Sequence, residues 1–139
     1  MLKIEGKNIE ITRGNMLPIT VTAGDDLKDN EYEFQVGNVI RFKIFDSKDV
    51  NKIYLQKDFK IEEIATEKTI IMTAGEMKIG ELSNKAATYW WEIDLNPDTD
   101  EEQTIVGCEL NETGDLDPAI ITILPEGGIK ASEGGDVQW

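Results

Sequence analysis

ATYWWEIDL, residues 87–95, has the composition of a single β-strand, because its β-branched and aromatic residues favour an extended backbone. Successive side chains of a strand point to opposite faces. One face of this segment therefore carries Tyr89, Trp91, Ile93 and Leu95. The other face carries Thr88, Trp90, Glu92 and Asp94. We expect Trp91 to lie in a core and Trp90 to lie beside carboxylates on the opposite side of the sheet.

The same alternation recurs on both sides of this strand, in short segments separated by Gly, Asn, Asp and Pro. The other segments of this kind are residues 8–14, 16–22, 38–45, 53–59, 69–73, 103–110 and 119–125. About eight such strands predict an all-β fold, an Ig-like antiparallel β-sandwich. The sequence AGEMKIGEL, residues 74–82, allows at most one short helical turn. Side chains expected to point inward include Ile40, Phe42 and Ile44.

Residues 11–15, ITRGN, contain a turn between two of these segments. Gly14-Asn15 supplies a tight turn, which predicts a hairpin between the segments at residues 8–14 and 16–22. Arg13 precedes the turn, and its guanidinium is suited to donate hydrogen bonds to a carboxylate or to loop carbonyls. We therefore assign framework roles to Arg13, Gly14 and Trp91.

The chain length of 139 residues fits one domain with its own core. We assign residues 1–125 to the β-sandwich domain. Residues 126–139 contain paired glycines and no alternating core positions, so we expect a Gly-rich flexible C-terminal tail. Trp139 ends this tail, where it either stays loose or lodges in a pocket of a neighbouring subunit.

The formal net charge of −14 argues against nucleic acid and anionic membranes as partners, because both repel an acidic protein. The N-terminal segment MLKIEGKNIEI has no continuous apolar run, and no later segment is long enough to predict a transmembrane helix. Cys108 is the lone cysteine, which agrees with a reducing compartment. We expect Cys108 to act as a small apolar residue within a strand.

The absence of histidine removes the commonest general base and the commonest metal ligand. Residues 94–98 begin like a calcium-binding loop, but Thr99 stands where the loop needs glycine and Ile105 stands where it needs glutamate. No spacing selects a pair of carboxylates for acid–base catalysis. The sequence therefore predicts a protein that is not an enzyme and that has no cofactor and no metal site.

Trp90 has three competing interpretations. The side chain covers the second face of the sheet beneath a loop, lies against a long Lys or Arg side chain of a neighbouring strand, or anchors another protein chain. An aromatic centre beside Glu92 and Asp94 has the anatomy of a protein interface. We therefore name Trp90, Glu92 and Trp139 as the candidate partner interface.

Four segments together resemble small structural proteins of tailed phages and prophages of Gram-positive bacteria. They are ITRGN at 11–15, VGNVIRFKIF at 36–45, TYWWEIDL at 88–95 and ITILPEGG at 121–128. The closest resemblance is to the N-terminal β-sandwich domain of baseplate upper proteins, and it spans about residues 8–125. Relatives have an aspartate where this chain has Asn15 and Asn38.

This resemblance implies a non-enzymatic virion structural protein of the tail or baseplate. Such a protein is synthesised in the bacterial host cytoplasm and acts through contacts with other phage structural proteins, as a homo-oligomer or within a symmetric particle. A capsid decoration protein on the phage head is the first alternative. A carbohydrate-binding β-sandwich module is the second, with Trp90 and Glu92 as its platform for a sugar ring.

Overall fold

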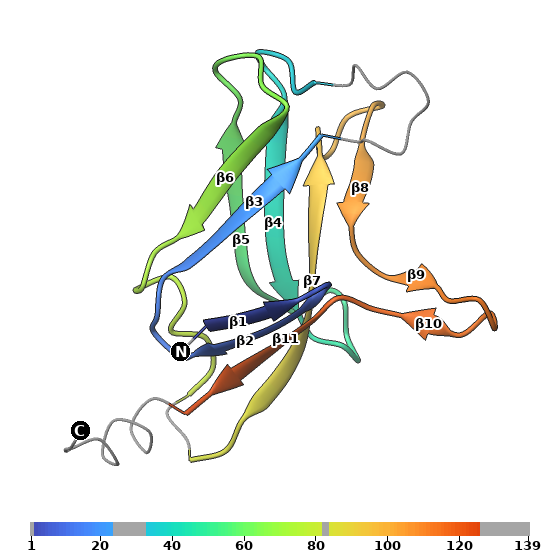
Figure 1. Cartoon of the computed structure of the whole chain (residues 1–139). Coiled ribbons are helices and arrows are strands. Elements are labelled where there is room, and N and C mark those ends of the chain that lie inside the picture. Colours follow the sequence, from blue (N-terminus) through green and yellow to red (C-terminus); the bar gives the residue numbers. More distant parts are fainter. Residues whose placement is uncertain (1, 24–32, 82–83, 126–139) are drawn as a thin grey trace.

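The computed structural model describes residues 2–23, 33–81 and 84–125, and these residues form an all-β structure (Figure 1). It contains eleven strands and no helix within those ranges. The strands are β1 (Leu2–Glu5), β2 (Asn8–Thr12), β3 (Leu17–Thr22), β4 (Val39–Phe45), β5 (Ile53–Lys60), β6 (Glu67–Met72), β7 (Ala87–Leu95), β8 (Gln103–Val106), β9 (Glu109–Leu110), β10 (Leu116–Asp117) and β11 (Ile120–Leu124). No helix in these ranges is long and apolar enough to cross a membrane.

The prediction of about eight strands was too low. Strand β1 was missed because all four of its residues are exposed, so it has no buried side to reveal it. Residues 103–110 form two strands, β8 and β9, interrupted at Gly107 and Cys108. Strand β10 has only two residues and lies between the predicted strands at 103–110 and 119–125, where no strand was expected. Cys108 is exposed between strands, which corrects the expectation of an apolar residue inside one.

The segment expected to make a helical turn makes one hydrogen-bonded turn at residues 74–77. The amide of Met77 donates to the carbonyl oxygens of Thr73 and Ala74, at 3.1 and 3.2 Å. Met77 is fully buried and Ile79 is 5 % exposed. The turn therefore fixes these two apolar side chains in the core without continuing into a helix.

Seven strands form the larger sheet, in the order β1-β2-β11-β7-β4-β5, with β8 also paired to β7. Strands β3 and β6 form a separate two-stranded ribbon, and β9 pairs with β10. All pairs are antiparallel except β11 with β2, where Ile121 lies opposite Ile9 in a parallel register. The sheet is therefore mixed, which corrects the prediction of a purely antiparallel fold.

The predicted hairpin between the segments at residues 8–14 and 16–22 is wrong, because β2 and β3 belong to different sheets. The turn is nevertheless present: the amide of Asn15 donates to the carbonyl oxygen of Thr12 at 3.0 Å, and Gly14 has a φ of 86°. This turn carries the chain from the larger sheet to the ribbon. The Arg13 guanidinium donates hydrogen bonds to the carbonyl oxygens of Lys78, Ile79 and Gly80, which follow the turn at residues 74–77.

One apolar core lies between the larger sheet and the ribbon. Leu17 and Ile70 enter it from the ribbon, while Ile40 and Ile93 enter it from the larger sheet. Ile40, Phe42 and Ile44 have no exposed surface, as the alternation of β4 predicted. Trp91 is 4 % exposed, and its ring lies 5.8 Å from that of Phe42. Its indole Nε1 donates to the carbonyl oxygen of Lys7 at 3.0 Å, so the polar atom of this buried ring is satisfied.

The sheet forks along one edge of β7. The first half of that edge, from Ala87 to Trp90, pairs with β11. The second half, from Ile93 to Leu95, pairs with β8. After β8 the chain leaves the sheet, runs through the β9–β10 hairpin and returns as β11, so the hairpin grows out of the fork (Figure 1).

Candidate interaction surface

The face of β4, β5 and β7 that points away from the core carries most of the predicted site. In β4, Arg41, Lys43 and Phe45 alternate with the three fully buried residues. The register places Arg41 opposite Asp94 of β7, Lys43 opposite Glu92, and Phe45 opposite Trp90. Charged pairs therefore occupy the middle of this outer face, and an aromatic pair occupies one end of it.

Trp90 and Phe45 form the aromatic pair. Their ring centroids lie 6.4 Å apart and the rings meet edge to face, at an interplanar angle of 78°. Phe45 is only 6 % exposed, whereas Trp90 is half-buried. The ammonium of Lys43 lies 5.6 Å from the centre of the Phe45 ring, a distance at which a cation is attracted to an aromatic face. Trp90 thus rests on an aromatic ring and keeps part of its own ring at the surface.

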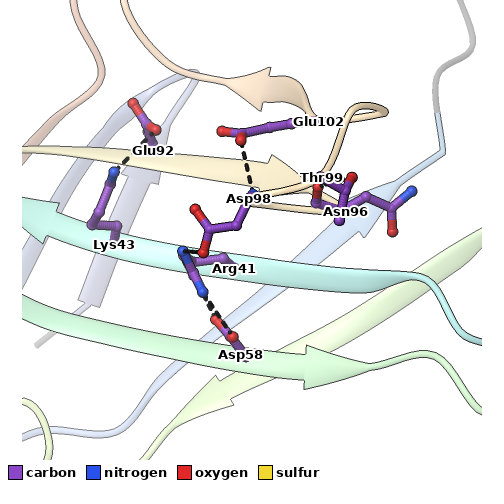
Figure 2. Close-up of polar contacts among 8 residues, drawn as sticks. All are labelled: Arg41, Lys43, Asp58, Glu92, Asn96, Asp98, Thr99 and Glu102. Carbon is purple, nitrogen blue, oxygen red and sulfur yellow. Dashed lines mark hydrogen bonds and ion pairs between the residues drawn. The ribbon is translucent and has the colours of Figure 1, made fainter.

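Arg41 joins two strands and a loop on this face, as Figure 2 shows. Its Nε and Nη2 donate to the two carboxylate oxygens of Asp58 on β5, at 2.7 and 3.1 Å. Its Nη1 donates to Asp98, which lies in the turn after β7, at 3.0 Å. The hydrogen bond to Asp58 is the largest cause that raises the pKa of Arg41 above its ordinary value. A bidentate pair of this kind fixes the orientation of both side chains.

Glu92 follows Trp90 by two positions on the same face of β7, and Asp94 follows Glu92 by two more. The ammonium of Lys43 is 3.5 Å from the Glu92 carboxylate (Figure 2). Their side chains are 24 and 23 % exposed, so water partly screens this ion pair. The pair borders the aromatic rings with one positive and one negative group.

Asp94 is a buried carboxyl group on a face that was expected to be solvated. It is only 2 % exposed, and the hydroxyl of Thr104 on β8 donates to it at 3.0 Å. Its pKa is raised to about 7, first by burial, then by a hydrogen bond with Glu92 and by the negative charge of Glu92. The Thr104 hydrogen bond and the charge of Lys43 act in the opposite direction. Asp94 therefore exchanges a proton near neutral pH.

In the turn after β7, side-chain and carbonyl oxygens accept hydrogen bonds from other groups of the protein. The Asn96 side-chain oxygen accepts from the amide of Val39 at 3.1 Å, and the Asn96 carbonyl accepts from the hydroxyl of Thr99 at 2.8 Å. Glu102 accepts from the amide of Asp98 at 2.9 Å (Figure 2). Across the described ranges, no group of three or more acidic or Cys side chains is arranged to hold a metal ion.

The structure brings together two of the three predicted interface residues, Trp90 and Glu92, on one face. Trp139 lies outside the described residues, as does the whole predicted tail at 126–139. The sequence reasoning missed Phe45, although the alternation that placed Ile40, Phe42 and Ile44 inward also places Phe45 on the opposite side of the strand. It missed the burial of Asp94, which depends on β8 folding back beside β7 and has no local signal.

No family model matches this chain, and neither a curated protein nor a solved structure is significantly similar to it.

Proposed function

We propose that this chain is a non-enzymatic structural protein of a phage or prophage virion, a component of the tail or baseplate. In this proposal it is made in the bacterial cytoplasm and binds other phage structural proteins in a symmetric assembly. The outer face of β4, β5 and β7 is the surface through which it binds them. We call this surface the Trp90 face and define it by Arg41, Lys43, Phe45, Trp90 and Glu92.

The observation that carries the proposal is the aromatic pair with its charged border. Trp90 is partly exposed and its ring packs edge to face against Phe45, so the indole is oriented before any partner arrives. Residues that contribute most to protein interfaces are commonly Trp, Tyr and Arg surrounded by polar groups. Lys43 and Glu92 supply such a border next to the rings.

The resemblance to baseplate proteins gains a structural meaning in this proposal. The stretches that carry it include β4, β7 and β11, which are direct neighbours in the larger sheet. The resemblance therefore concerns one continuous part of the fold. We further propose that the larger sheet and the β3–β6 ribbon are the two layers of an Ig-like sandwich, because both supply side chains to one core.

The test is to induce virions from a strain that carries the gene and to locate the protein on them. Immunoelectron microscopy should place it at tail tips. Particles carrying Trp90→Ser should contain at least about tenfold less of the protein, because the main anchor is lost. Ile71→Ser is the matched control, since Ile71 is an exposed apolar residue of β6, in the ribbon. Absence of the protein from purified virions would refute the proposal.

The same experiment separates the tail from the head. Label on isolated heads instead of tail tips would replace the tail proposal with a capsid decoration protein. Both roles need a small folded domain that adds to an existing assembly, so the location of the label distinguishes them.

A carbohydrate-binding module is a second candidate, favoured by the partly exposed ring of Trp90 beside the Glu92 carboxylate. Aromatic rings stack on sugar rings, and carboxylates accept hydrogen bonds from hydroxyl groups. A glycan array with the wild-type protein and Trp90→Ala tests it. A glycan signal that the substitution abolishes would favour this function over the virion proposal.

A further inference from the structure

The β9–β10 hairpin, residues 108–117, projects from the fork of the larger sheet, and we call it the arm (Figure 1). All ten of its residues are exposed. Leu110 and Leu116 lie directly opposite each other across the hairpin and are 68 and 63 % exposed. A cross-strand leucine pair is normally placed against other apolar surface. On this arm the pair faces none of the described core.

An apolar groove of about 390 Å³ is lined by residues of the ribbon and of the larger sheet. Trp91 and Ile93 contribute to its floor, and Ile19 of β3, Ile4 of β1 and Val106 of β8 line it. Among the described residues around it none has a carboxyl group, and Lys7 is the one charged residue. In a chain with 28 acidic and 14 basic residues, this makes the groove unusually free of negative charge.

The arm and the groove are neighbours but do not meet within one chain. The Lys7 ammonium, on the lining of the groove, donates to the carbonyl oxygens of Gly107 and Asp117, at 3.1 and 2.7 Å. It also lies 3.7 Å from the carboxylate of Glu109 and 3.5 Å from that of Asp117. Lys7 therefore holds both ends of the arm at the rim of the groove. Neither Leu110 nor Leu116 lines the groove of its own chain.

We propose that two copies of this chain exchange arms, so that the leucine pair of each arm occupies the groove of the other copy. Because arm and groove are adjacent, a two-fold axis beside them brings each arm to the groove of the other copy. The contact then forms twice and closes as a dimer. This inference goes beyond the proposed function, since it uses neither the Trp90 face nor a location in a virion.

Charge favours the groove as the site for the arm. The arm carries Glu109, Glu112, Asp115 and Asp117 and no Lys or Arg. Like charges that face one another oppose association. Most of the acidic surface of a second copy would therefore repel this arm. The lining of the groove is mostly apolar and has no carboxylate, and its one charged residue, Lys7, pairs with Glu109 and Asp117 of its own chain. The groove of a second copy therefore offers the arm apolar surface whose lining adds no negative charge.

Sedimentation equilibrium on the full chain tests the proposal. The wild type should form a dimer, and Leu110→Ser/Leu116→Ser should raise the dissociation constant at least about tenfold. The matched control is Val36→Ser/Val50→Ser, because these valines are 64 and 57 % exposed and lie outside the arm and the groove. The control should dimerise like the wild type.

A second pair of variants tests the groove. Thr22 is exposed on β3 and lines the groove, so Thr22→Glu adds the carboxylate that the groove lacks. It should weaken dimerisation, whereas Gln56→Glu, at an exposed position of β5 outside the lining, should not. Mixing Thr22→Glu with Leu110→Ser/Leu116→Ser leaves one intact arm facing one intact groove, and a weak mixed dimer should form.

A distance measurement on the wild-type sequence tests dimer formation without any substitution. Cys108 is the lone cysteine and is exposed at the start of the arm, so a spin label attaches there alone. Labelled protein should give one distance between the two labels of a dimer. A wild type that stays monomeric at about 1 mM, growth beyond the dimer, or a dimer that the leucine substitutions leave unchanged would overturn the proposal.

Discussion

Asp94 makes the stability of this protein depend on pH in a direction opposite to that of most carboxylates. Burial and Glu92 raise the pKa of its carboxyl group from an ordinary value of 3.8 to about 7 in the folded chain. Between these two values the folded state holds a proton that the unfolded chain has already released. The free energy of unfolding therefore falls as the pH rises through this window, and the loss is complete above about pH 7.

Asp94→Asn should remove this dependence. An amide has nearly the shape of the protonated carboxyl group and stays neutral, so the variant should be more stable than the wild type at pH 8 by about 1 kcal/mol or more. Near pH 4 the two proteins should be similarly stable. Urea unfolding at a series of pH values measures the difference.

Glu63→Gln serves as its control, because Glu63 is an exposed carboxylate outside the Trp90 face. Its stability should follow the wild-type curve. A gain in stability for Asp94→Asn that is equal at pH 4 and pH 8 would contradict the proposed role of the buried proton.

The turn that connects β2 to β3 decides how the two sheets are joined. Its hydrogen bonds reach outside the turn, since the Gly14 amide donates to the Met77 carbonyl oxygen at 3.0 Å. Gly14 has a φ of 86°, in the left-handed region where a side chain is strained. The turn therefore holds the larger sheet, the ribbon and the turn at residues 74–77 in one arrangement.

Gly14→Ala should lower the free energy of unfolding by about 1 to 2 kcal/mol, because alanine is strained at this φ. Gly75→Ala is the matched control: an added Cβ there meets nothing within 4 Å, and Gly75 is not among the glycines of positive φ. Chemical denaturation of both variants measures the difference. Equal losses of stability would show that the conformation of Gly14 is not what the turn requires.

Local pattern was sufficient for the longer strands that have a buried side, and insufficient for the partners of these strands. The alternation in β4 and β7 correctly assigned Ile40 and Trp91 to the core, because alternation and burial belong to the same short segment. The partner of β2 is different, since β11 lies more than a hundred residues later and nothing near Ile9 specifies it. A tight turn after β2 suggested a hairpin with β3, but in the structure β2 pairs with β11 instead.

The candidate site was predictable to a similar extent. Trp90 and Glu92 were placed on one face by alternation alone, and the structure brings them there. The charge network around Arg41 required knowing that β4 lies between β5 and β7, which the sequence does not state. Leu110 was assigned to the end of the strand at 103–110 and Leu116 to no strand, because two-residue strands are too short to show a period.

The charge of the whole molecule works against its compact state. With a net charge of −14, the acidic groups repel one another across the folded surface. Exposed ion pairs such as Lys3 with Glu5, at 3.9 Å, offset little of this repulsion. Salt should therefore stabilise this protein, because it screens the repulsion more than it weakens the few ion pairs.

Raising sodium chloride from about 10 mM to about 300 mM should raise the melting temperature by about 4 °C, which corresponds to about 1 kcal/mol in a domain of this size. Calorimetry at fixed pH measures it. The same titration on Leu110→Ser/Leu116→Ser separates screening within one chain from association between copies. A melting temperature that falls with salt would mean that the ion pairs dominate.

The parallel pairing of β2 with β11 also sets when this protein can finish folding in a cell. Residues 8–12 leave the ribosome early, yet the strand that completes their side of the sheet ends at residue 124. Until β11 has been made, β2 has no hydrogen-bonding partner on that edge. The apolar side chains of β2 are then more exposed in the nascent chain than in the folded protein. Closure of the sheet therefore waits until β11 has been made, and chaperones that bind nascent chains would meet this chain with β2 and β11 still apart.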